Sequence, residues 1–185
     1  VIAAADVLLY LSRRYDCFNN FSLDPTGAIS SREYEKLTSI LRCRYFPLIP
    51  YAGMNGVTLM AGMNLYFMRN RLPLSAEWRF FNHDIWERIA KMLADDIPVI
   101  MAVGPNFPFF WQNNRTVLYT KDGNGSYRPS SSAKAHYVTV TGLDESWVQI
   151  SSWGRLLYIN RAEFDEYTKK HSAGFLCSIL YIKHK

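Results

Sequence analysis

The first half of the chain carries apolar side chains at helical spacing. Residues 1 to about 14 read VIAAADVLLYLSRR, a run so apolar that we expect a helix buried on most of its faces. A second helix is predicted from Ser30 to about residue 44, because Ser30 and Glu33 form a capping-box pattern. Residues 57 to about 69, and a segment that opens at Asp84 with Glu87, predict two more helices.

After Pro98 the pattern changes from a helical to a strand-like period. VIMAVG, residues 99–104, predicts a short buried strand, and alternation continues in TVLYT, HYVTVTGL, SWVQISS, RLLYI and GFLCSILYI. One further helix is indicated after Asn160, with Glu163 three residues on. Residues 77–81 are expected to be extended. Residues 123–135, rich in Gly, Ser and Pro, are expected to form a surface loop.

Helices first and antiparallel strands later indicate an α+β fold rather than a doubly wound parallel sheet. The 185 residues suit a single domain, helical over about 1–96 and mainly β over about 97–185. Two closely packed lobes are equally compatible with that length. Apolar residues make up 49% of the chain and charged residues 20%, so we expect a folded rather than a disordered protein.

Charge and motifs narrow the range of partners. The net charge is +5, but Lys and Arg are scattered rather than gathered in a stripe, so we expect no nucleic-acid partner. The apolar run at the start contains Asp6 and is too short to cross a bilayer, so no integral membrane segment is expected. Neither GxGxxG nor GxxxxGK[ST] is present, and no cofactor is expected.

The cysteines do not indicate a metal site. Cys17, Cys43 and Cys177 lack the close spacing of a zinc site or of a dense disulfide framework, and no histidine stands at ligand spacing from them. Each is interpreted as an ordinary small apolar residue, although one disulfide remains open. So few cysteines are compatible with a bacterial cytoplasm or with secretion, which leaves the compartment undecided.

One histidine stands out by its position. His136 opens the strand HYVTVTGL, and 15 residues later the next strand ends in Ser151, Ser152, Trp153 and Gly154. In an antiparallel pair, the start of the first strand lies beside the end of the second. We therefore expect the Ser151 hydroxyl close to a ring nitrogen of His136.

This segment, together with IPVIMAVGP before it and the short helix around Phe164 after it, resembles the histidine-to-NSWG segment of papain-like cysteine peptidases. It is more similar to the bacterial members that process bacteriocin leaders and to their uncharacterised homologues. The resemblance covers residues 97 to about 170 well, and VIAAADVLLYL is similar to the family's nucleophile helix from its third position onward. It implies a papain-like fold, with a helical N-terminal lobe packed on an antiparallel sheet.

The resemblance also implies roles for individual residues. The nucleophilic Cys is expected two residues before Val1, at a helix N-terminus that lowers the pKa of a thiol. His136 is the expected general base, and Ser151 takes the place of the family's orienting Asn or Asp. A hydroxyl carries no charge, so it should orient an imidazolium less well than Asp does.

Aromatic side chains are the candidate substrate contacts. Trp153 would cover the histidine, while Phe107 and Trp111, in the loop NFPFFWQ, would line a groove for a peptide or protein substrate. That loop is equally well explained as a cover for the sheet edge. The leading expectation is a thiol hydrolase of the peptidase type. A non-catalytic peptide-binding or scaffolding domain is the alternative, and a thiol transferase or amidase is a third.

Overall fold

The computed structural model describes residues 1–14, 29–46, 54–80, 84–107, 109 and 111–185. Within them lie five helices and eight strands. The helices are α1 (Ile2–Arg14), α2 (Ser31–Arg44), α3 (Gly56–Arg69), α4 (Ile85–Ala94) and α5 (Arg161–His171). The strands are β1 (Leu74–Trp78), β2 (Val99–Val103), β3 (Thr116–Lys121), β4 (Tyr127–Ala133), β5 (His136–Leu143), β6 (Trp147–Ser152), β7 (Arg155–Asn160) and β8 (Ile179–His184).

All five predicted helices are confirmed, and side chains cap three of them. The Ser30 side chain accepts a hydrogen bond from the Glu33 N–H, and Asn160 caps α5 in the same way through Glu163. Asn55 caps α3. Helix α4 begins where predicted but without a side-chain cap, because the Asp84 carboxylate instead accepts two hydrogen bonds from the Arg79 guanidinium.

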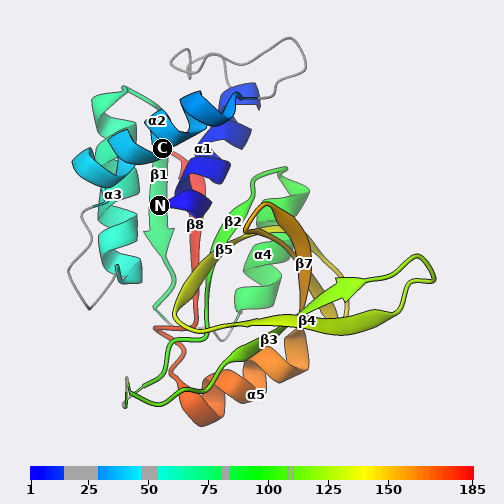
Figure 1. Ribbon diagram of the computed structural model, residues 1–185. Coiled ribbons are helices and arrows are strands. Elements are labelled where there is room, and N and C mark those ends of the chain that lie inside the picture. Colours follow the sequence, from blue (N-terminus) through cyan, green and yellow to red (C-terminus); the bar gives the residue numbers. More distant parts are fainter. Residues whose placement is uncertain (15–28, 47–53, 81–83, 108, 110) are drawn as a thin grey trace.

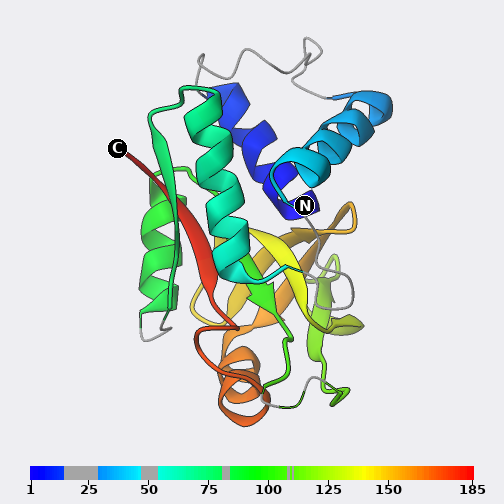
Figure 2. The same ribbon diagram turned by 90° about the vertical axis from the view of Figure 1, so that its left-hand side faces the viewer.

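The strands form one eight-stranded sheet in the order β1-β8-β2-β5-β6-β7-β3-β4, with every neighbouring pair antiparallel. The molecule is thus α+β, as the sequence predicts. Figure 1 shows α1, α2 and α3 together in the upper part, with β1 and β8 reaching up among them. The remaining strands lie below, next to α5. Helix α3 lies along β1 and α1 packs on β2 and β5 (Figure 2).

Three strand predictions need correction. Strand β1 begins earlier than expected, at Leu74, and β8 begins later, at Ile179, because residues 174–177 form a turn. Residues 127–133 are not a loop but strand β4 at the sheet edge, paired with β3. The polar composition of β4 fits an edge position, where Pro129 is tolerated and most side chains are exposed.

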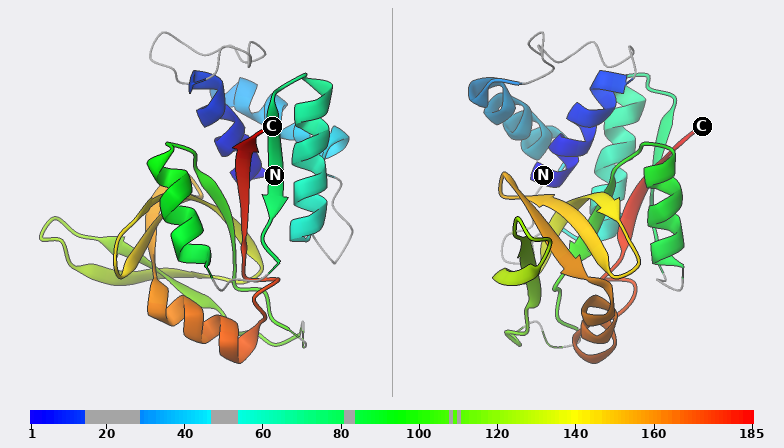
Figure 3. Two further views of the ribbon diagram at one scale, coloured as in Figure 1. Left: turned by 180° about the vertical axis from the view of Figure 1, so that it is seen from behind. Right: turned by 90° about the vertical axis from the view of Figure 1, so that its right-hand side faces the viewer.

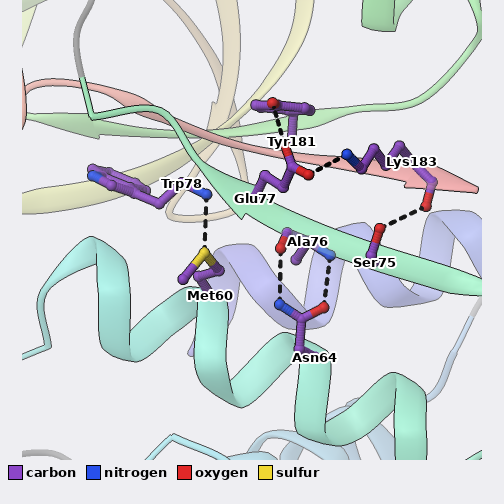
Figure 4. Close-up of polar contacts among 8 residues, drawn as sticks. All are labelled: Met60, Asn64, Ser75, Ala76, Glu77, Trp78, Tyr181 and Lys183. Carbon is purple, nitrogen blue, oxygen red and sulfur yellow. Dashed lines mark hydrogen bonds and ion pairs between the residues drawn. The ribbon is translucent and has the colours of Figure 1, made fainter. Parts of the chain in front are cut away.

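The β1–β8 edge is tied to α3 by side chains on facing elements (Figure 4). The Asn64 side chain donates a hydrogen bond to the Ala76 carbonyl, at 2.8 Å, and accepts one from its N–H, at 2.9 Å. On the strands themselves, Glu77 accepts a hydrogen bond from the Tyr181 hydroxyl and pairs with Lys183. The Asn64 contacts join the helical part to the sheet, and the Glu77 contacts join β1 to β8.

Candidate functional site

His136 lies at the start of β5, beside the turn that joins β6 to β7. The register pairs Thr139 with Ser151, which places the beginning of β5 next to the end of β6. The imidazole Nε2 lies 2.7 Å from the Ser152 Oγ, within hydrogen-bonding distance. Ser152 is buried, so this contact is shielded from solvent.

Ser152, rather than Ser151, therefore supplies the hydroxyl that contacts His136, which corrects the expectation from the sequence. Successive side chains of a strand point to opposite faces, so only one of two adjacent serines can meet the ring. Ser151 is half-buried and lines the cavity beside the histidine instead. The order of the strands thus predicts the correct strand end next to His136, but the Ser151 side chain points to the other face of β6.

Trp153 covers the histidine. Its ring stacks on the imidazole with the ring centroids 4.6 Å apart and an interplanar angle of 13°. Its backbone has a φ of 50°, in the left-handed region that is unfavourable for a non-glycine residue, and 55% of its surface is exposed. Ala135, just before His136, also lies in that region, with a φ of 49°. Strained backbone thus flanks the ring on both sides, as is common where a side chain is held for function.

The N-terminal end of α1 approaches the histidine from the helical part. The right-hand view of Figure 3 shows the chain start next to the β6–β7 turn. A cavity of about 250 Å³ lies between them, lined by Ile2, Ala3 and Asp6 on one side and by His136, Tyr137, Ser151, Ser152 and Trp153 on the other. Burial of the ring lowers the pKa of His136 below its ordinary value.

A second, smaller cavity adjoins His136, with a volume of about 170 Å³. Asn55 and Gly56, at the start of α3, lie on one wall, while Ala135, Tyr137 and Asn106 lie on others. The Tyr137 hydroxyl donates a hydrogen bond to the Met54 carbonyl at 3.0 Å, which ties β5 to the segment before α3. His136 thus lies between two cavities at the junction of the helical part and the sheet.

Phe107 and Trp111 do not line either of these cavities. Phe107 packs edge-on against Phe175 with a centroid separation of 5.5 Å, while Trp111 contacts Phe109 and is 78% exposed. Of the described residues in the loop NFPFFWQ, Asn106 alone lines the smaller cavity. Trp153 is the one predicted substrate contact that the structure brings to His136, and contacts from Phe107 and Trp111 to a substrate stay a prediction.

The described cysteines do not serve this site. Cys43 is exposed on α2, and Cys177 is buried in a setting where burial raises the pKa of its thiol. Neither lines a cavity beside His136. Cys17 lies outside the described residues. Over the described ranges, no group of three or more His, Cys, Asp or Glu side chains is placed to hold a metal ion.

The described helices include none with the length and apolarity needed to cross a membrane. No family model, curated protein or solved structure matches this chain. Its functional assignment therefore rests on the geometry around His136.

Proposed function

We propose that this chain has a papain-like fold and belongs to a thiol hydrolase that cleaves peptide bonds, with His136 as its general base. The observation that carries the proposal is the position of His136: its Nε2 contacts a buried hydroxyl, an aromatic ring covers it, and the N-terminal end of α1 lies across a cavity from it. A histidine that activates a nucleophile needs one neighbour that orients its ring and a second ring nitrogen that can reach the nucleophile.

The nucleophile would be a Cys two residues before Val1 in the full-length protein. The positive end of the α1 dipole favours the thiolate, and His136 would hold the proton taken from the thiol. The sulfur then attacks the peptide carbonyl carbon and forms a tetrahedral intermediate. As the C–N bond breaks, His136 returns its proton to the leaving amine. Water, deprotonated by His136, hydrolyses the thioester and restores the thiol.

Ser152 would be a positioning residue for this base. Its hydroxyl accepts a hydrogen bond from an Nε2–H, which leaves the other ring nitrogen to exchange protons with the thiol. It carries no charge, so it stabilises an imidazolium less than an Asp or Asn would. That weakness favours the second candidate function, a papain-like peptide-binding or scaffolding domain without catalysis.

The test is alkylation of the full-length protein by iodoacetamide at about pH 6, followed by peptide mapping. We expect a Cys upstream of Val1 to be labelled fastest, with His136→Ala slowing the reaction roughly a hundredfold because the thiolate is lost. His184→Ala, which removes an exposed histidine far along the chain on β8, is the matched control and should leave the rate unchanged.

Ser152→Ala should slow the same labelling by about fivefold, the worth of one neutral hydrogen bond, whereas Ser151→Ala should leave it unchanged. The peptidase mechanism fails if the full-length protein has no upstream Cys, or if that Cys reacts no faster than a free thiol. The binding-domain function would then take its place.

A further inference from the structure

Asp6 lies in a groove that starts at His136 and follows α1. The cavity beside His136 is continued by a second one of about 320 Å³, and the two share Asp6 and Ser151 in their walls. Leu9, Tyr10 and Arg13 extend the α1 wall of the groove, and Thr139 of β5 also lines it. Asp6 is therefore at the junction of the two cavities, one helical turn beyond Ile2 or about 6 Å along the helix axis.

The Asp6 carboxylate is poorly solvated. It accepts a hydrogen bond of 2.7 Å from the Tyr34 hydroxyl of α2. Burial raises the pKa of Asp6, although the hydrogen bond from Tyr34 lowers it in part. A carboxylate that has lost water gains from a cation placed beside it, because the opposite charge replaces the lost solvation.

The walls of the groove suit a long side chain with a cationic tip. Among the described residues that line the two cavities, Asp6 is the single acidic one, and Arg13 is the single Lys or Arg and lines the second cavity alone. Ile2, Ala3 and Trp153 add apolar surface to the first cavity, where Asp6 has no basic Lys or Arg beside it in the lining. Lys and Arg bury their methylene stems along such surface while their charged ends find a polar partner. One carboxylate is too few for a calcium or magnesium site, which needs several oxygen ligands.

We propose that Asp6 recognises the side chain of a lysine or arginine in a bound peptide, close to the residue that His136 acts on. The identity of the ligand as a substrate rests on the proposed function, whereas its binding does not. Asp6 is then a specificity residue: it selects a basic peptide without taking part in bond cleavage.

The experiment is an NMR titration of the protein with Nα-acetyl-lysine methylamide and with the norleucine analogue, which has the same stem but no charge. The indole N–H of Trp153 reports occupancy of the groove. We expect the lysine compound to bind about fivefold more tightly, as for one ion pair at a partly exposed site. In Asp6→Asn the two compounds should bind equally.

Two variants separate recognition from folding. Tyr34→Phe removes the hydrogen bond to Asp6 but keeps the carboxylate, so the preference for lysine should persist. Asp165→Asn is a matched control, since Asp165 is also a helical carboxylate that accepts a hydrogen bond from an aromatic side chain, Trp86, and it should keep the preference.

The proposal is overturned if the intact protein binds neither compound, if it binds both equally, or if Asp6→Asn retains the preference. These outcomes do not depend on thiol chemistry. A preference for lysine without a reactive upstream Cys would support recognition by Asp6 and defeat the peptidase. A reactive upstream Cys without a preference for lysine would support the peptidase and rule out recognition by Asp6.

Discussion

The two sides of β2 are built in different ways. At the β1–β8 edge, five residue pairs run in unbroken register, and Asn64 satisfies both backbone groups of Ala76 (Figure 4). Between β5 and β6 the register shifts after Val140, and left-handed residues flank His136. The β1–β8 edge has regular strand pairing, whereas the region around His136 has a shifted register and left-handed backbone next to the imidazole ring. Such departures persist where the rest of the fold supports them.

The regular edge should matter most for stability. Asn64→Ala removes both hydrogen bonds to the buried Ala76 backbone, so we expect the free energy of unfolding to fall by about 2–3 kcal/mol. Urea unfolding measures this loss, and Asn113→Ala, at an exposed position, is the control. The His136 pKa, followed by NMR, should not change. If stability is unaffected, the proposed division between the two regions is wrong.

At Trp153 we expect a substitution to change the pKa of His136 but not to lower the stability of the protein. Glycine adopts a φ of 50° without strain, so Trp153→Gly should lose no stability or should gain up to about 1 kcal/mol. It also removes the ring that covers His136, so solvation of the imidazolium should raise the pKa of His136 toward its ordinary value. NMR titration of the ring together with urea unfolding tests both effects. A large loss of stability would show that Trp153 is a structural residue instead.

The smallest effect should be a dependence of stability on pH. Burial lowers the pKa of His136 below 6.5, so near and below that pH the unfolded chain binds more protons than the folded one. The stabilisation from the neutral ring is present above pH 6.5 and is lost as the pH falls through 6.5 toward the folded-state pKa.

Urea midpoints at about pH 7.5 and about pH 5.5 measure that loss. His136→Asn should show a smaller decrease between the two conditions than the unchanged protein, and His184→Ala should match the unchanged protein. An equal decrease in His136→Asn would mean that other groups set the pH dependence.

Local sequence patterns predicted the elements whose conformation depends on residues that are adjacent in the sequence. The Ser30–Glu33 pattern marks a helix start because the cap and the helix are adjacent in sequence, and the structure forms that contact. Strand β4 was missed because its polar residues pair with β3 at the sheet edge, and its conformation depends on that partner. Short-range pattern does not contain this information.

The candidate site was predictable as far as it depends on strands that are neighbours in the sequence. A hairpin brings His136 close to the Ser151–Ser152 pair whatever its details, so the neighbourhood followed from the order of the strands. The shifted register and the turn at Trp153 decide which hydroxyl meets the ring, and both are properties of the folded sheet. Asp6 was noted only as a charge in an apolar helix, because the groove it lines involves β6, far away in the sequence.

Strand β8 has a consequence for synthesis of the protein on the ribosome. It lies between β1 and β2, although both are translated long before it. Until β8 emerges from the exit tunnel, β1 has no neighbouring strand to pair with, and its apolar residues cannot be fully enclosed. A nascent chain halted before Ile179 therefore exposes an unpaired strand, and such chains are candidates for chaperone capture or aggregation.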